Sequence, residues 1–283
     1  MSATVLHAKP GLLDRLDLLL LRLAKRRRGR LDSASDFYES YFTEEDAGRY
    51  LGDVRSAWRF GVMRRTFDRL FPDGSADVVD VGCGLGTSRL YLPRTARFVG
   101  VDVSERALAS ARCHRRDGAE FQLGGFPDLP VGSACCDFAI CLEVLEHLAD
   151  DEAAVRELRR IVRPGGYLLV SVPSTYYWPG YRNLIGHYRH YTPRSLAALL
   201  EGGGFAVVEQ FPQFKRFWRA YHYLYVALRA AELAARRLAR ESFSLLDSRA
   251  YRRLASAILR RLEARAHERD ASSTLLLCRR ESA

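Results

Sequence analysis

The chain of 283 residues is long enough to bury a full hydrophobic core, and its 48% hydrophobic and 28% charged residues are typical of a globular protein. The net charge of +10 is uneven: residues 1–35 carry +5 and residues 215–270 carry +8, whereas residues 36–214 carry −4. This distribution argues against a nucleic-acid-binding track across the central region.

The cysteines and the apolar segments bear on the cellular location of the protein. The six cysteines, at positions 83, 113, 135, 136, 141 and 278, contain no C-x-x-C pair and are expected to be reduced. Positive charge follows the leucine-rich stretch of residues 11–23 instead of preceding it, and charged residues interrupt that stretch. The sequence therefore predicts a cytoplasmic protein, with peripheral contact at the inner face of the membrane as the alternative.

Residues 1–70 are expected to be helical. Leucines of residues 11–30 recur at helical spacing, and a basic run, Lys25–Arg30, follows. A helix docked on the protein or on a second subunit is favoured, and a membrane-surface helix is the alternative. Residues 34–70 are rich in aromatic side chains and predict helices that lead into a first strand.

Residues 77–211 alternate between strand and helix patterns. The predicted strands span 77–81, 97–101, 119–123, 137–142, 166–172 and 205–211. The predicted helices lie near 86–92, 104–115, 150–162 and 194–202, and the turns Pro164–Gly166 and Gly202–Gly204 are expected to end helices. This alternation indicates βαβ units and a parallel, doubly wound sheet.

Residues 213–270 break that rhythm. Aromatic and aliphatic residues recur at helical spacing with arginines between them, and residues 273–278 read as a final strand. We therefore expect a helical insertion before the last strand. Packing on the core or on a second subunit in a homodimer is favoured, and a lid or a membrane-surface patch formed by 11–30 and 213–240 is the alternative.

A glycine-rich turn carries the strongest functional signal. An apolar run ends in Asp80, and Gly82, Gly84 and Gly86 follow at every second position. Glycine lets a ligand approach the main chain, and open α/β sheets bind nucleotide-like ligands at the carboxyl ends of their strands. The next strand ends in Asp102, which could accept hydrogen bonds from ribose hydroxyls or cap the following helix.

Three segments together resemble the successive motifs of class I S-adenosylmethionine-dependent methyltransferases: VVDVGCGLGTSRLYL, FVGVDVSERALASAR and CDFAICLEVLEHLADDEAAVRELRRIVRPGGYLLVSVP. The resemblance covers about half of the chain. It implies an α/β fold with a seven-stranded sheet of order 3-2-1-4-5-7-6, strand 7 antiparallel, and S-adenosyl-L-methionine as methyl donor. The expected domains are an N-terminal helical segment (1–70), the cofactor-binding domain (71–212 plus 271–283) and the helical insertion (213–270).

The resemblance also implies roles for individual residues. The methionine part of the cofactor would face Asp80, the backbone of Gly82, Cys83, Gly84 and Gly86, and the strand tip at Leu142 and Glu143. Asp102 would take the ribose and Val103 would pack on the adenine. The family often has an acid after the third strand, where this chain has Gly124, Gly125 and Phe126. Phe126 could still cover the adenine, and backbone carbonyls near Gly125 could accept hydrogen bonds from its amine. Asp128 could take the place of the missing acid.

Methyl transfer to an oxygen usually needs a proton acceptor. Glu143, Glu146 and His147 have helical i, i+3, i+4 spacing, and His187 and His190 follow the fifth strand. The favoured hypothesis has no metal: His147, His187 or His190, with Glu146, deprotonates or orients the acceptor. The alternative is a divalent metal held by these carboxylates and imidazoles, in a pattern that resembles quinone-pathway and small-RNA O-methyltransferases.

The predicted function is methyl transfer to a small-molecule oxygen, with secondary-metabolite, sugar, lipid-linked and quinone-like acceptors all open. An RNA 2′-O-methyltransferase is the second hypothesis, which the acidic core disfavours. A non-catalytic cofactor-binding scaffold is the third. Arg189 could bind an anionic substrate group or form a salt bridge.

Overall fold

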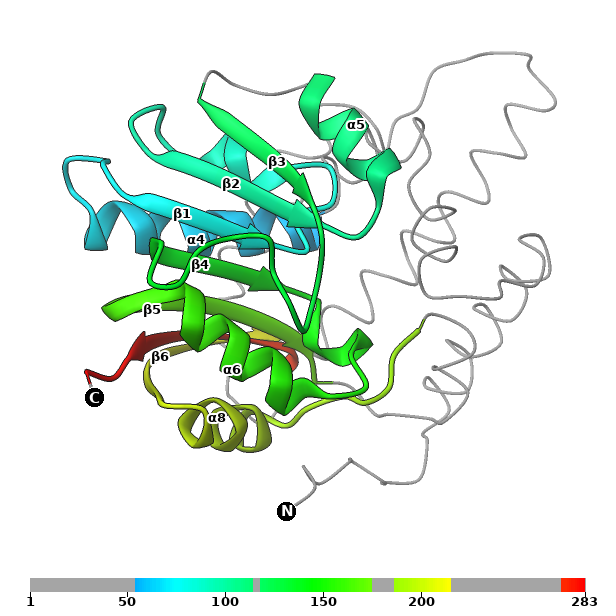
Figure 1. The fold of residues 1–283 in the computed structure, drawn as a ribbon. Coiled ribbons are helices and arrows are strands. Elements are labelled where there is room, and N and C mark those ends of the chain that lie inside the picture. The colour runs from blue at the N-terminus through cyan, green and yellow to red at the C-terminus, as the bar shows by residue number, and fades with distance from the viewer. Residues whose placement is uncertain (1–53, 114–117, 175–185, 215–270, 283) are drawn as a thin grey trace, which may run out of the picture.

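The computed structural model describes residues 54–113, 118–174, 186–214 and 271–282, which form one sheet with flanking helices (Figure 1). The strands are β1 (Asp77–Val81), β2 (Arg97–Asp102), β3 (Ala119–Leu123), β4 (Cys136–Leu142), β5 (Val162–Pro173), β6 (Phe205–Phe214) and β7 (Ala271–Arg280). The helices are α4 (Val54–Leu70), α5 (Glu105–Cys113), α6 (Asp151–Ile161) and α8 (Pro193–Gly202), with short 3-10 helices η1 (Thr87–Tyr91) and η2 (Leu145–His147). The predictions for residues 1–53 and for the insertion at 215–270 lie outside the described residues.

The seven strands are arranged in the order β3-β2-β1-β4-β5-β7-β6. Strand β1 pairs in parallel with β2 and β4, and β7 runs antiparallel to both β5 and β6. The predicted strand order and the antiparallel seventh strand are therefore confirmed. Because β1 is central and β2 and β4 flank it, the loops after these three strands meet at one edge of the sheet.

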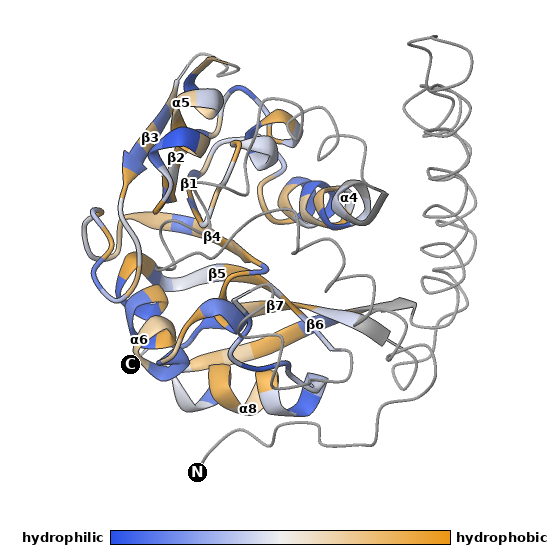
Figure 2. Cartoon of the chain, turned by 90° about the vertical axis from the view of Figure 1, so that its right-hand side faces the viewer, coloured by the Kyte–Doolittle hydropathy of each residue, from blue (hydrophilic) through white to orange (hydrophobic). Residues whose placement is uncertain are grey.

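Two hydrophobic cores hold the sheet from its two faces. Met63 and Phe67 of α4 pack with Phe138 on one face, and Leu158 of α6 and Leu200 of α8 belong to the core on the other. In Figure 1, α4 lies behind the sheet and α6 and α8 lie in front of it. Figure 2 shows mainly hydrophobic residues along the central strands and mixed residues along α4 and α6. The sheet is thus a buried, rigid platform for the loops at its edge.

The helix predicted near residues 86–92 is a short 3-10 helix over residues 87–91, and Leu92 after it is extended because Pro93 restricts the residue that precedes it. One local prediction was wrong. The turn at Pro164–Gly166 lies inside β5, which begins directly after α6 at Val162 and is accommodated by a register shift opposite β4. Among the described helices, none is long and apolar enough to cross a bilayer.

Candidate functional site

The glycine turn after β1 packs directly against the turn after β4. Gly82 has a φ of +74°, and a Cβ there would lie 2.4 Å from Cγ2 of Val144. Gly86 has a φ of +67°, and a Cβ there would lie 2.8 Å from the Phe121 ring. Both positions combine a left-handed backbone with a close neighbour, which only glycine tolerates. These glycines therefore let the turn pack closely on Val144 and Phe121, with Gly86 buried and Gly82 exposed at the sheet edge.

Asp102 holds the glycine turn from the end of β2. One carboxylate oxygen accepts from the Gly84 amide at 2.7 Å and the other from the Ser104 amide at 2.9 Å. The Ser104 hydroxyl accepts from the Ala107 amide at 3.1 Å, so Ser104 caps helix α5 and Asp102 does not. A carboxylate offers about four acceptor sites, so Asp102 can hold this turn and accept ligand hydroxyls together.

Asp80 is buried beneath the turn at the end of β1. Desolvation raises the pKa of Asp80 to about 7; the Ser88 hydroxyl, which donates to this carboxylate, opposes that rise, and the Asp102 charge adds to it. Burial also raises the pKa of the Cys83 thiol, which therefore stays neutral. The Cys83 sulfur lies 2.8 Å from where a Cβ on Gly100 would be, so this side chain packs on β2 and Cys83 offers its backbone to the site.

A second part of the edge lies between the ends of β2 and β3. Val103 is 44% exposed, and a Cβ on Gly125 would lie 2.5 Å from its Cγ1, so the structure brings these two predicted residues into contact. Phe126 is half-buried and packs partly against the core. Asp128 is exposed and pairs with Gly125 through the backbone.

Glu143 does not share a helical face with Glu146 and His147, so that expectation was wrong. Only Leu145–His147 form a helical turn, and Glu143 precedes it with a φ of +58° at the tip of β4, next to half-buried Leu142. Its carboxylate accepts from the Ser171 hydroxyl at 2.8 Å and pairs with Arg59 at 3.4 Å. Glu143 therefore ties β4 to β5 and α4.

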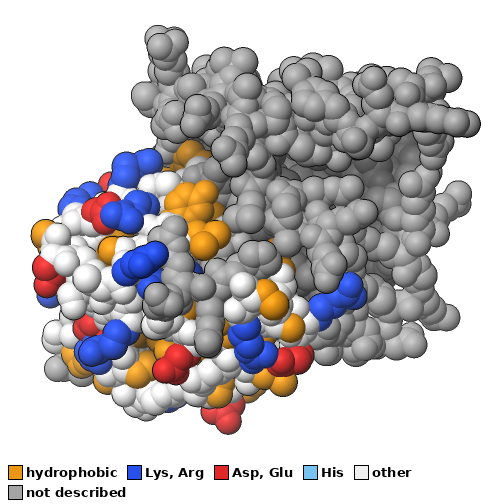
Figure 3. Space-filling view, turned by 90° about the horizontal axis from the view of Figure 1, so that it is seen from above, with side chains coloured by type: hydrophobic (Ala, Val, Ile, Leu, Met, Phe, Trp, Pro, Cys, Tyr) orange, Lys and Arg blue, Asp and Glu red, His pale blue; other side chains and the backbone are white. Residues whose placement is uncertain are grey.

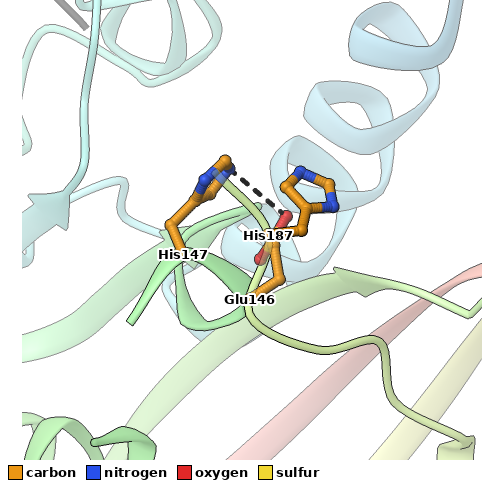
Figure 4. A group of neighbouring side chains, drawn as sticks. All are labelled: Glu146, His147 and His187. Atoms are coloured by element: carbon orange, nitrogen blue, oxygen red, sulfur yellow. Dashed lines mark ion pairs between the residues drawn. The ribbon is translucent and has the colours of Figure 1, made fainter. Parts of the chain in front are cut away.

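Glu146, His147 and His187 form a compact cluster beside the β4 turn (Figure 4). One ligating atom from each side chain lies within 4.8 Å of the other two. The His147 and His187 rings meet edge to face at 4.5 Å, and His147 Nε2 lies 3.9 Å from a Glu146 oxygen. Glu146 is 1% exposed, and neither of its oxygens has a hydrogen-bond partner among the described residues.

Burial disfavours the charged form of each side chain in this cluster. Desolvation lowers the pKa of His147 to about 4 and that of His187 to about 2, and it raises the pKa of Glu146 well above its ordinary value. His190 is buried, and its Nε2 lies 2.8 Å from Nδ1 of His187. Neutral imidazoles can accept a proton, and the lowered pKa values make these two rings weak bases.

The segment that carries His187 and His190 is fixed to the β4 turn. The Tyr188 amide donates to the Glu146 carbonyl at 2.7 Å. Arg189 donates to the Ala149 carbonyl at 2.6 Å and pairs with Asp151. Arg189 therefore forms a salt bridge, which was one of the two roles expected for it, the other being to bind an anionic substrate group. All four predicted catalytic side chains thus lie together at one edge of the sheet.

Sequence reasoning missed three contributors to this edge: Ser88, Arg59 and Asp151. Ser88 lies on η1, eight residues after its partner Asp80, a spacing that no regular helix would connect. Arg59 lies on α4, far along the chain from Glu143. Asp151 is the first residue of α6, where a negative charge is already favoured by the helix N-terminus. Of these three residues, only Asp151 had a signal in the sequence, because Asp150 and Asp151 are two successive acids at the start of a predicted helix.

Parts of the chain are similar to known methyltransferases. Residues 79–170 match the family model of a methyltransferase domain. The chain is 34% identical over 135 residues to a probable S-adenosylmethionine-dependent methyltransferase of Mycolicibacterium smegmatis, covering 46% of this chain and 52% of the relative. It is 34% identical over 118 residues to a ubiquinone biosynthesis O-methyltransferase of Idiomarina loihiensis, covering 40% and 47%. The chain therefore spans about half the length of these relatives.

A solved structure has the same fold. An N-methyltransferase of Bradyrhizobium japonicum in complex with S-adenosyl-L-homocysteine superimposes with a TM-score of 0.58 at 16% identity, covering 89% of this chain and 100% of that chain. At this identity the likeness concerns the fold.

Proposed function

We propose that the chain is a class I S-adenosylmethionine-dependent methyltransferase that transfers a methyl group to an oxygen of a small molecule. The match of residues 79–170 to a methyltransferase domain and the similarity to a probable S-adenosylmethionine-dependent methyltransferase support this proposal. One observation carries this proposal: Gly82 of the glycine turn packs against Val144. Val144 begins the turn that carries the neutral imidazole of His147. Donor and proton acceptor are thereby adjacent at one edge of the sheet. The similarity to an O-methyltransferase over 118 residues supports oxygen as the acceptor atom.

The cofactor lies, in this proposal, across the ends of β1, β2 and β4. Asp102 takes the ribose hydroxyls, and the adenine rests between Val103 and the Gly125–Phe126 turn. The methionine part faces Asp80, the glycine turn and the β4 tip at Leu142 and Glu143. The exposed backbone of Gly82 at the sheet edge supports this placement.

The chemical step is an in-line displacement in which the sulfonium is already an activated leaving group. The acceptor oxygen becomes strongly acidic as its bond to the methyl carbon forms. A neutral imidazole of low pKa, His147 or His187, can therefore take the proton at that stage. Burial of the cluster excludes water from the reacting atoms.

Replacing His147 with alanine tests this assignment. We expect His147→Ala to bind S-adenosylhomocysteine within threefold of wild type and to lose about 100-fold or more of turnover, the usual contribution of a general base. Turnover is followed by S-adenosylhomocysteine release over a panel of phenols, quinols, sugars and hydroxylated secondary metabolites. Unimpaired turnover in the variant would remove His147 from the reaction.

The raised pKa of Asp80 predicts a pH-dependent cofactor affinity. The ionised carboxylate attracts the cofactor's ammonium group, so affinity should rise with pH and be about tenfold weaker at pH 6 than at pH 8. By linkage, protonated Asp80 stabilises the fold at low pH, and that stability is lost as pH rises from about 4 to about 7. Calorimetric titrations at several pH values check the affinity. Asp80→Asn should flatten the profile, and an unchanged slope in that variant would contradict the assignment.

A metal-assisted O-methyltransferase is the second candidate, and the close grouping of Glu146, His147 and His187 favours it. A buried carboxylate without a hydrogen-bond partner and two neutral imidazoles form a donor set that suits a divalent ion. Such an ion would lower the pKa of an acceptor hydroxyl. Glu143 does not belong to this group, because its carboxylate pairs with Arg59.

Chelation and direct binding distinguish the two candidates. Without a metal, EDTA should leave turnover within twofold of the untreated enzyme, and a calorimetric titration with Mn²⁺ should show no site. One Mn²⁺ per chain that is lost in Glu146→Gln would instead support the second candidate, and this readout needs no acceptor.

We further propose that residues 71–212 and 271–283 form the catalytic domain, which is supported by the pairing of β6 and β7 across the intervening residues. Residues 1–70 and 213–270 are proposed to cap the acceptor site and to make oligomer or membrane contacts. A nucleic-acid acceptor is disfavoured, because basic and acidic side chains are interspersed on the described part of the face in Figure 3.

A further inference from the structure

One carboxylate, that of Asp151, fastens the histidine-bearing segment to the rest of the fold. One of its oxygens pairs with Arg189, and the other accepts from the Tyr191 hydroxyl at 2.7 Å. Asp151 is 6% exposed and lies in the first turn of α6, where the helix N-terminus favours a negative charge. Both oxygens are therefore engaged by the same short segment.

The two residues that Asp151 holds flank His190 in the sequence. Tyr191 is fully buried, and its hydroxyl also lies 3.4 Å from the Leu145 carbonyl. Arg189 donates to the Ala149 carbonyl as well. With a residue fixed on each side of it, His190 has little freedom to move, and this buried ring contacts His187 at 2.8 Å.

The His187–His190 contact decides which nitrogen of His187 can accept a proton. Nδ1 of His187 and Nε2 of His190 share one hydrogen between them. The tautomer and the orientation of His187 are thus coupled to those of His190, and the His187 ring lies 4.5 Å from that of His147. A loosened His190 would leave His187 able to rotate and to change tautomer.

We propose that Asp151 is a positioning residue: through Arg189 and Tyr191 it holds His190, which in turn orients His187 at the methyl-acceptor site. Asp151, Arg189 and Tyr191 together form the clamp. This role rests on the proposed function. Asp151 itself touches none of the reacting groups. Its effect reaches the site through two side chains and one imidazole–imidazole hydrogen bond, each of which can be altered separately.

The test uses the full chain labelled with ¹⁵N-histidine, with EDTA present, and follows the imidazole N–H signal of the His187–His190 pair. His187→Gln assigns that signal by removing it. We expect Asp151→Asn to speed the solvent exchange of this N–H at least tenfold or to broaden it beyond detection. Asp150→Asn is the matched control, because it removes one negative charge from the same turn while its amide oxygen can still cap α6; the signal should remain as in wild type.

Affinity for S-adenosylhomocysteine separates positioning from general loss of structure. It should stay within threefold of wild type in both variants, because Asp151 binds Arg189 and Tyr191, whereas Asp102 accepts from the amides of Gly84 and Ser104. If Asp151→Asn does not fold, Tyr191→Phe replaces it in the test, because this variant removes the hydrogen bond from the Tyr191 hydroxyl to Asp151 and keeps the Arg189 pair. Its imidazole N–H should exchange at a rate between that of wild type and that of a free imidazole. An unchanged exchange rate in Asp151→Asn, or in Tyr191→Phe where that variant substitutes for it, overturns the proposal.

The outcome is distinguishable from failure of the proposed function. If His187→Gln leaves turnover intact while Asp151→Asn loses the N–H signal, the clamp is real and the catalytic role of His187 is wrong. If Asp151→Asn keeps the signal, the clamp is wrong whatever the reaction.

Discussion

Asp102→Ala is expected to weaken binding of S-adenosylhomocysteine by 100-fold or more. Hydrogen bonds to a charged group contribute about 1.5–3 kcal/mol each, and the proposal assigns two ribose hydroxyls to this carboxylate. Two such bonds correspond to at least about two orders of magnitude in affinity. The substitution also removes the hydrogen bond that the Gly84 amide donates to Asp102 at 2.7 Å, which holds the glycine turn in place. Isothermal titration calorimetry measures the effect directly.

Glu105→Ala provides the matched control for this experiment. It removes a carboxylate three residues away, on the first turn of α5, where Glu105 pairs with Arg112 on the surface. We expect its affinity for S-adenosylhomocysteine to equal that of wild type. An Asp102→Ala protein that stays folded and binds within threefold of wild type would remove Asp102 from the ribose site.

Gly86→Ala is expected to destabilise the fold by roughly 3 kcal/mol and to reduce cofactor affinity at least tenfold. A left-handed backbone costs a residue with a Cβ about 1–2 kcal/mol, and overpacking costs about 1–3 kcal/mol. Both terms apply here, because φ is +67° and the new Cβ would lie 2.8 Å from the Phe121 ring and 3.1 Å from the Ala111 Cβ. Urea unfolding measures the stability, and calorimetry measures the affinity.

Gly118→Ala separates the two terms. Gly118 has a similar φ of +78°, but a Cβ there would meet nothing within 4 Å. This variant should lose about 1–2 kcal/mol of stability through its backbone alone and keep full cofactor affinity. Equal losses of stability in the two variants would show that crowding against Phe121 does not explain the glycine at position 86.

The sheet could be predicted from the sequence because its signals are local. The bounds of β1 and β3 agree with the predicted ranges, since turn residues lie on both sides of each strand. The strand order came from the family resemblance and was confirmed. The start of β5 was missed, because pairing with β4 extends the strand through a Pro-Gly-Gly stretch that reads locally as a turn.

The sequence predicted which residues lie at the site, but it did not predict how their side chains are oriented. Spacing suggested a helical turn over Glu143, Glu146 and His147, but the backbone of Glu143 is left-handed and its side chain turns toward Arg59 and Ser171. That choice depends on groups from α4 and β5, which are distant in sequence. Asp151 shows the same limit, because its partners lie some 40 residues along the chain. Long-range polar contacts leave no periodic signal in a single sequence.

The structure of the full chain with bound S-adenosylhomocysteine tests the central claim most directly. The account predicts ribose hydroxyls within hydrogen-bonding distance of Asp102, adenine against Val103, and a sulfur atom that faces the cluster of Glu146, His147 and His187. A cofactor bound at another edge of the sheet, or with its sulfur directed away from this cluster, would contradict it.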